Sequence, residues 1–207
     1  MRIIGGTAAG LILKVPKGFD VRPTPDLVRQ AVFNSLGERV NGARVLELFG
    51  GTAALSLECL SRGAVHAVCV EKSPRHAQFI RENRENARLP ASALDVRVQD
   101  ALAAIPQMAA SGQQFDLILA DPPYGEKNVG RRSTSFAQKL LDSTELSKLL
   151  TEDGLFVLGH TKRDTLSFPD WWGEARMLKH GDTIMRILKR KAVAAGADDK
   201  LDDQRSN

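Results

Sequence analysis

Short apolar runs alternate with segments of helical periodicity along most of the chain. The apolar runs predict strands over residues 44–49, 64–70, 94–98, 115–120 and 155–158. Between these runs, apolar residues recur at helical spacing and predict helices over residues 53–62, 74–88, 101–110 and 135–150. Strands that alternate with helices indicate an α/β fold, in which a mostly parallel sheet is covered by helices on both faces.

The N-terminal end shows a different pattern. Residues 2–4 and 11–15 flank a Gly-rich turn and predict a small N-terminal β-hairpin extension over residues 1–21. Thr24 and Pro25 then predict the start of a helix, with Thr24 as the N-cap and Pro25 as the first helical residue. We therefore expect the main domain to open with a helix that follows this extension.

The C-terminal end predicts an antiparallel closure of the sheet. Residues 174–179 and 183–189 flank a Gly-Asp turn and are typical of a hairpin. These two strands bring the expected sheet to seven strands, with an antiparallel edge strand. The α/β domain then extends over residues 22–190, and residues 191–207 lack periodicity and predict a disordered tail.

Composition limits the class of protein. The chain has 207 residues, of which 43% are hydrophobic and 26% charged, which is typical of one globular domain and excludes a fibrous or disordered chain. No apolar run approaches the ~20 residues of a membrane-spanning helix. Two cysteines, Cys59 and Cys69, are too few for a disulfide framework and favour a reducing, cytoplasmic location. The histidines and cysteines show no metal-ligand spacing, so we expect no metal.

Charge adds a hint about the partner. The chain carries 29 Lys and Arg against 25 Asp and Glu, and its net charge is +4. Basic residues gather in residues 1–40 and 176–191. Such a distribution fits a polyanion such as nucleic acid, although a solvated surface would look the same. The candidates for phosphate contacts are Arg22, Arg29, Lys189 and Arg190.

Three acidic residues lie at or near the ends of predicted strands, where α/β sheets bind their ligands. Glu47 precedes the turn at Gly50 and Gly51, and an acid at this place suits an amino group rather than a phosphate. Glu71, at the end of the next strand, is placed to hold a ribose diol. Asp100 is placed to accept a hydrogen bond from an adenine amino group, to cap the following helix, or both. Surface ion pairs or helix caps remain the simpler alternatives for Glu47 and Glu71.

The most specific pattern is Asp121-Pro122-Pro123-Tyr124, directly after an apolar strand. Two successive prolines fix the backbone, because each ring locks φ and the second restricts the residue before it. The carbonyl of Pro122 is then held beside the carboxylate of Asp121, and the two acceptors match the two hydrogens of one planar amino group. Tyr124 offers a flat face for a base.

Together, the Gly turn, Glu71, Asp100 and the motif at 121–124 resemble the class I S-adenosylmethionine-dependent methyltransferases that methylate amino groups. Residues 2–6 (Arg-Ile-Ile-Gly-Gly), 22–24 (Arg-Pro-Thr) and 60–64 (Leu-Ser-Arg-Gly-Ala) narrow this resemblance to the bacterial RsmD family, over about residues 1–190. The family methylates N2 of a guanine in small-subunit (16S) rRNA. Ala53 departs from the family's usual glycine, and we expect its methyl group to lie close to the cofactor.

The resemblance implies a Rossmann-like sheet, S-adenosylmethionine as the cofactor, and small-subunit rRNA in a ribosomal particle as the partner of a cytoplasmic, monomeric enzyme. The implied catalytic residues are Asp121, Pro122, Pro123 and Tyr124. The implied cofactor-binding residues are Glu47, Phe49, Gly50, Gly51, Glu71, Lys72, Asp100 and Ala101. Two alternatives stay open. The same strand ends would serve an adenine-N6 or other amino-group methyltransferase, and a catalytically weak RNA-binding assembly protein would carry the same motifs.

Overall fold

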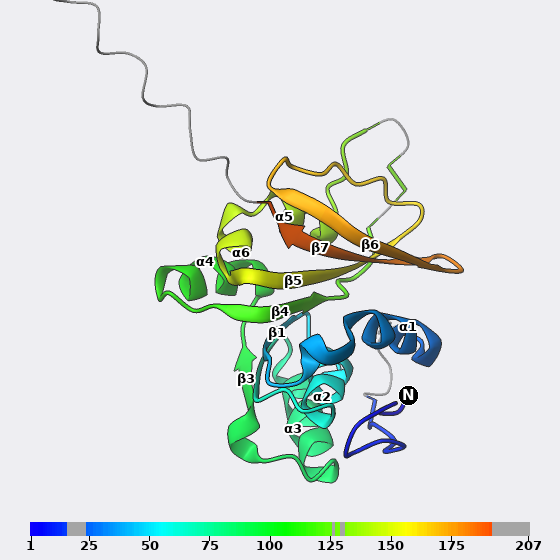
Figure 1. Ribbon diagram of the computed structural model, residues 1–207, viewed down its shortest axis with the longest axis vertical. Helices are drawn as coiled ribbons and strands as arrows, with labels where there is room; N and C mark the ends of the chain where they lie inside the picture. The colour runs from blue at the N-terminus through cyan, green and yellow to red at the C-terminus, as the bar shows by residue number, and fades with distance from the viewer. Residues whose placement is uncertain (16–23, 126, 129–130, 192–207) are drawn as a thin grey trace, which may run out of the picture.

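The computed structural model describes residues 1–15, 24–125, 127–128 and 131–191 of the chain. Its centre is a seven-stranded sheet with the strand order β3-β2-β1-β4-β5-β7-β6, in which β7 runs antiparallel to both of its neighbours (Figure 1). The strands are β1 Arg44–Leu48, β2 His66–Glu71, β3 Leu94–Val98, β4 Phe115–Ala120, β5 Leu150–Thr161, β6 Trp172–His180 and β7 Thr183–Arg190. The predicted mostly parallel sheet with an antiparallel edge is confirmed.

Helices cover both faces of this sheet (Figure 1). They are α1 Asp26–Leu36, α2 Ala54–Ser61, α3 Pro74–Asn86, α4 Ala101–Ala110, α5 Phe136–Asp142 and α6 Thr144–Lys148, with short 3₁₀ turns η1 Gly37–Val40 and η2 Ala91–Ala93. The first three helices share one hydrophobic core and the last three share the other. Successive strand residues feed the two cores in turn: Val45 packs with α1–α3, and Leu46 packs with α4–α6.

The register of the central strands brings their carboxyl ends to one edge of the sheet. Leu48, the last residue of β1, lies level with Val70 in β2 and with Ala120 in β4. The chain then turns sharply at Gly50, whose amide donates to the carbonyl of Val70 at 2.9 Å. A Cβ at Gly50 would collide with the Sγ of Cys69, so only glycine allows β1 to leave the sheet this close to β2.

Helix α1 begins differently from the prediction. Pro25, rather than Thr24, occupies the N-cap position with extended φ and ψ, and no side chain caps this end. The hydroxyl of Thr24 instead donates to the carboxylate of Asp121. A bond to an ionised acceptor is stronger than a cap between neutral groups, and the fold brings that acceptor within reach.

The helix predicted over residues 135–150 is broken at Ser143. This residue leaves the helical conformation, and its Oγ accepts from the amide of Leu146 at 3.1 Å. Ser143 is thereby the N-cap of the next helix, α6. Serine favours such caps because its side chain competes with the helix backbone. Strand β5 is also longer than predicted, because Leu150 pairs with Phe115 ahead of an irregularity in the β4–β5 ladder.

The two arms of the N-terminal extension pair over a shorter length than the predicted strands. An antiparallel bridge joins Arg2 and Ile12, and the amides of Ile3 and Leu13 donate to the carbonyls of Leu11 and Met1 at 2.9 and 3.1 Å. The amides of Ile4 and Gly5 donate to the Glu58 carboxylate of α2, at 2.7 and 2.8 Å. These two bonds tie the extension to the main domain. The predicted tail lies outside the described residues, except for Lys191.

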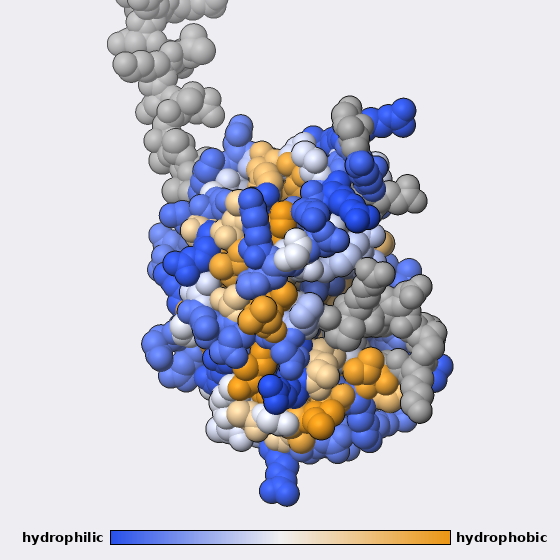
Figure 2. Space-filling model, turned by 90° about the vertical axis from the view of Figure 1, so that its right-hand side faces the viewer, coloured by the Kyte–Doolittle hydropathy of each residue, from blue (hydrophilic) through white to orange (hydrophobic). Residues whose placement is uncertain are grey.

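Figure 2 shows the face that is turned to the right in Figure 1, where the turn between β6 and β7 projects. A band of hydrophobic surface runs through the middle of this face, and hydrophilic surface lies on its margins. Among the described residues, no helix combines the length and the apolar character that a membrane span requires.

Candidate active site

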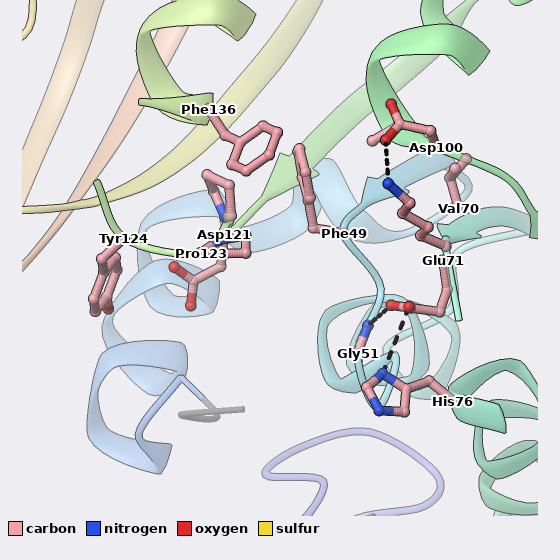
Figure 3. A pocket seen from close by; sticks show the side chains of 13 residues that line it. Phe49, Gly51, Val70, Glu71, His76, Asp100, Asp121, Pro123, Tyr124 and Phe136 are labelled. Atoms are coloured by element: carbon pink, nitrogen blue, oxygen red, sulfur yellow. Dashed lines mark hydrogen bonds and ion pairs between the residues drawn. The ribbon is translucent and has the colours of Figure 1, made fainter. Parts of the chain in front are cut away.

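A cavity of about 620 Å³ lies at the edge where the parallel strands end (Figure 3). Its volume is in the usual range for a small-molecule or cofactor site. It is lined by Phe49, Gly51, Val70, Glu71, Lys72, His76, Asp100, Ala101, Asp121, Pro122, Pro123, Tyr124 and Phe136. Within the described ranges, no three His, Cys, Asp or Glu side chains gather as metal ligands would.

The structure brings most of the predicted site residues together. All four predicted catalytic residues line the cavity, as do six of the predicted cofactor-binding residues: Phe49, Gly51, Glu71, Lys72, Asp100 and Ala101. Glu47 and Gly50 do not line it. The sequence interpretation missed Val70, His76 and Phe136. Val70 precedes Glu71 and could have been included, whereas Phe136 is brought in from α5 by the tertiary fold.

Glu71 is anchored at the end of β2. One carboxylate oxygen accepts from the amide of Gly51 and the other from the amide of Ser73, both at 2.7 Å. The Nδ1 of His76 lies 3.5 Å from the second oxygen. These bonds fix the side chain against the turn after β1. Each oxygen keeps a further lone pair, so the carboxylate can still accept from the hydroxyl groups of a ligand.

Asp100 caps the following helix, as the sequence indicated, and lies on the cavity wall, and its contact with an adenine amino group stays a prediction. Its Oδ1 caps α4 by accepting from the amides of Leu102 (3.0 Å) and Ala103 (3.4 Å), and the carboxylate lies on the cavity wall. The Nζ of Lys72 is 3.4 Å from Oδ2. Burial alone would raise the pKa of Asp100, but the bonds from Lys72 and the two amides outweigh it and lower the pKa. The group is therefore an ionised acceptor at neutral pH.

Glu47 does not reach the cavity, so the prediction that it contacts the amino group of a ligand is wrong. Its side chain is buried, and Oε2 accepts from the amide of Ser56 at 2.9 Å, with the Sγ of Cys69 at 3.7 Å. Burial raises the pKa of Glu47 to about 7, although these bonds oppose the shift. The carboxyl group holds the first turn of α2 to β1 and thereby shapes the turn at residues 50–53.

The turn itself differs from the expectation in one further respect. Ala53 is fully buried, does not line the cavity and adopts a left-handed conformation (φ 57°). The expectation that its methyl group lies against the cofactor is therefore wrong. Phe49 is also left-handed (φ 60°), which is unusual for a residue with a side chain. Its ring packs on Phe136, with 5.2 Å between the ring centroids, in the middle of the cavity (Figure 3).

Asp121 lies at the end of the cavity opposite Glu71 and Asp100, with the two phenylalanine rings between them (Figure 3). Its Oδ2 accepts from the hydroxyl of Thr24. Its Oδ1 is buried and has no hydrogen-bond partner within the described part of the chain. Burial raises the pKa of Asp121, and the bond from Thr24 opposes this shift. Tyr124 is 41% exposed, and its hydroxyl lies 3.1 Å from that of Thr183 at the start of β7.

The predicted RNA-contacting residues are scattered. Arg29 is fully buried, and its guanidinium donates to the carbonyls of Thr24 and Arg2, so the prediction that it contacts phosphate is wrong. Arg22 lies outside the described residues. Lys189 pairs with Leu155, at the end of the sheet away from the cavity. It is six positions along β7 from Thr183, which corresponds to about 20 Å. Arg190 follows Lys189 and lies still further from the cavity.

Other basic side chains lie close to the cavity. The Nζ of Lys139 is 5.3 Å from the centre of the Phe136 ring, which lines the wall. Lys162 and Arg163 directly follow β5, are exposed, and lie beside Asp182 in the β6–β7 turn. The sequence interpretation overlooked them because they belong to no dense basic run, and only the sheet topology places them at the end of β5 beside the site.

The fold and the cavity together define a class of protein: a class I, Rossmann-like methyltransferase, whose cofactor is S-adenosylmethionine. The residues fit this cofactor, because carboxylates at one end can accept from ribose hydroxyls and an adenine amino group, and two aromatic rings line the middle. The chain belongs to the family described as "Conserved hypothetical protein 95", whose model matches residues 1–189. This match, together with relatives named as rRNA methyltransferases, confirms the resemblance to the RsmD family.

Individual relatives agree with this assignment. The chain is 30% identical to "Ribosomal RNA small subunit methyltransferase D" of Escherichia coli (strain K12), over 93% of this chain and 91% of the relative. It resembles the solved structure of the hypothetical protein TTHA0928 of Thermus thermophilus with a TM-score of 0.72 and 29% identity, over 91% of this chain and 99% of that one. SMU.776, solved in complex with SAH, shares the fold (TM-score 0.63, 19% identity, 80% and 50% coverage).

Proposed function

We propose that the protein transfers a methyl group from S-adenosylmethionine to the exocyclic N2 amino group of a guanine in small-subunit rRNA. The observation that carries this proposal is Asp121, followed by Pro122, on the cavity wall. Asp121 lies across the cavity from Glu71 and Asp100 (Figure 3). The name of the E. coli relative supports small-subunit rRNA as the substrate.

The chemistry depends on how the amino group is held. When bound, S-adenosylmethionine supplies an electrophilic methyl group on a positively charged sulfur. An exocyclic amine is a weak nucleophile, because its lone pair is delocalised into the ring. Asp121 and the Pro122 carbonyl accept its two hydrogens, favour a pyramidal nitrogen and direct the lone pair at the methyl carbon. Most of the acceleration then comes from orientation.

Charge on Asp121 contributes in the same step. As the N–C bond forms and the C–S bond breaks, positive charge develops on the nitrogen, and the fixed carboxylate stabilises it. The surplus proton already lies against this carboxylate, whose pKa is raised by burial, and so has a route off the nitrogen. Tyr124, half-exposed at the mouth of the cavity, offers a stacking face for the guanine once it is splayed from the RNA.

A transfer assay tests the proposal. The full chain is incubated with methyl-labelled S-adenosylmethionine and either unmethylated small-subunit particles or naked small-subunit rRNA, and the RNA is digested to nucleosides for mass analysis. We expect label in N2-methylguanosine, with particles the better substrate. Label in N6-methyladenosine would replace guanine by adenine as the target. Cofactor binding without any transfer would indicate an RNA-binding assembly protein instead.

Glu71→Ala is expected to weaken cofactor binding by about 1–3 kcal/mol, the scale of hydrogen bonds to a charged group. The carboxylate is fixed by Gly51 and Ser73 in a position to accept from the ribose. Isothermal titration with S-adenosylmethionine measures the change. Glu85→Ala removes an exposed carboxylate from α3 and serves as the matched control. A dissociation constant equal to that of the wild type would exclude Glu71 as a cofactor ligand.

RNA binding is expected to depend on the basic residues near the cavity. The double variant Lys162→Ala/Arg163→Ala should lower the slope of log affinity against log salt by about 0.7 for each lost phosphate contact. The variant Lys189→Ala/Arg190→Ala removes the same charge from the far end of β7 and should change the slope less. Filter binding over a range of salt concentrations compares the two. A larger decrease of the slope in the second variant would indicate that the RNA binds the basic residues at 189 and 190, as the sequence pattern predicts.

A further inference from the structure

The carboxylate of Asp121 is held by a residue that lies far away in the sequence. Thr24 is largely buried, and its hydroxyl donates to Oδ2 of Asp121 across the gap between α1 and β4. We propose that Thr24 is a positioning residue, whose hydroxyl fixes the Asp121 carboxylate in the orientation that receives the substrate amino group. This inference rests on the proposed function, in which Asp121 accepts a hydrogen from that group.

The carboxylate requires such a partner. Its other oxygen, Oδ1, is buried against Gly159 and receives no hydrogen bond from the described residues. Burial raises the pKa of Asp121, and the hydrogen bond from Thr24 opposes this shift. A buried carboxylate without a hydrogen-bond donor is costly, and it is driven to rotate or to take up a proton. The Thr24 hydroxyl opposes both outcomes.

A neutral donor suits this position better than a cation would. Lys or Arg at position 24 would cancel the charge that the developing positive nitrogen needs, whereas a hydroxyl orients the carboxylate and leaves its charge intact. A carboxylate oxygen also has more than one lone pair. The bond from Thr24 therefore leaves Oδ2 able to accept a second hydrogen, and the two donors need not compete.

Thr24 itself is fixed by Arg29. The guanidinium is fully buried, and it donates to the carbonyl of Thr24 at 2.9 Å, to the carbonyl of Arg2, and to Asp26 at 3.0 Å. A charged donor holds a carbonyl more firmly than a neutral one. This network explains why an arginine is buried at the start of α1, and it sets the backbone from which the Thr24 hydroxyl reaches Asp121.

The test compares variants at position 24. Thr24→Val keeps the shape and loses the hydroxyl, whereas Thr24→Ser keeps the hydroxyl. We expect Thr24→Val to lower the single-turnover rate of methyl transfer by about 10- to 100-fold, the scale of one hydrogen bond to a charged group. Thr24→Ser should recover most of the rate. Because Thr24 does not line the cavity, the dissociation constant of S-adenosylmethionine and the half-saturating RNA concentration should stay near wild type.

A matched control exists at the other end of β4. There, the hydroxyl of Thr151 donates to the carboxylate of Asp116 at 3.1 Å. Thr151→Val removes an equivalent bond away from the cavity and should leave methyl transfer unchanged. Thr24→Ala, with a smaller side chain, repeats the test should valine disturb the packing, and thermal unfolding checks the fold of each variant.

The outcomes separate this inference from the proposed function. A wild-type rate in Thr24→Val, or a serine variant as slow as the valine variant, would overturn the role of Thr24. If Asp121→Ala is inactive while Thr24→Val keeps the wild-type rate, the proposed function stands and only the positioning role of Thr24 fails. If the wild-type protein transfers no methyl group to guanine, the proposed function itself fails.

Discussion

Asp121→Ala is expected to lower the single-turnover rate of methyl transfer by ~10²–10³-fold or more, the scale of one preorganised electrostatic contact. In the ground state, water can accept the hydrogens of the substrate amino group. In the transition state the nitrogen gains positive charge, and a fixed carboxylate gains stabilising strength as it does. The loss should therefore fall on the rate rather than on cofactor affinity, because Glu71 and Asp100, the proposed cofactor ligands, lie at the other end of the cavity.

The measurement is transfer of a labelled methyl group to small-subunit particles, with cofactor titration in parallel. Asp121→Asn should be milder, since its amide oxygen keeps one acceptor and loses only the charge. Asp153→Ala, which removes an exposed carboxylate within β5, is the control. Tyr124→Ala should act mainly on RNA affinity, through a stacking face worth ~1–3 kcal/mol. Retention of most of the rate in Asp121→Ala would refute the amino-acceptor mechanism.

Gly159→Ala is expected to lower the rate on the order of 10²-fold, since displacement of a catalytic group by about 1 Å can cost that much. An added Cβ would collide with Oδ1 of Asp121 and would lie 3.0 Å from its Cγ and 3.1 Å from the Sδ of Met185. The β5 backbone accepts alanine at this position, because φ is not in the left-handed region. The side chain of Asp121 must then move.

The control for this variant is Gly173→Ala in β6, where an added Cβ meets only ordinary contacts with Lys189 and Lys191, at 3.5 Å and beyond. We expect Gly173→Ala to keep the wild-type rate. Quenched single-turnover assays measure the rate of methyl transfer, and titration with S-adenosylmethionine shows whether the cofactor site is intact. Full activity in Gly159→Ala would show that the Asp121 carboxylate has room that the structure does not indicate.

Much of the fold follows from local pattern. The alternation of apolar runs with helical periodicity predicts a parallel sheet with two covered faces, and the structure confirms it. The acids at positions 71 and 100 and the motif at 121–124 each follow a predicted strand, and parallel strands end at one edge. Three separate sequence signals therefore predict one cavity, and all of these residues line it.

Local pattern predicts less well where a side chain has two available partners. Ser143 lies in a segment of helical periodicity, yet it caps a new helix and breaks the predicted one. Glu47 resembles Glu71 as an acid at a strand end, yet one points inward to the amide of Ser56 and the other lies on the cavity wall. Neighbouring residues do not encode this choice, because it depends on which elements pack above each strand.

The chain's own pattern thus determined the strands, the helices, their alternation and the edge at which chemistry occurs, because these depend on periodicity within a few residues. The tertiary structure alone decided which distant groups meet. Thr24 and Asp121 are 97 positions apart and share a hydrogen bond. Arg29 is a residue type that often binds phosphate, but here it is buried and donates to backbone carbonyls. Such contacts join elements that only the packing of α1 against the sheet brings together, so no local periodicity records them.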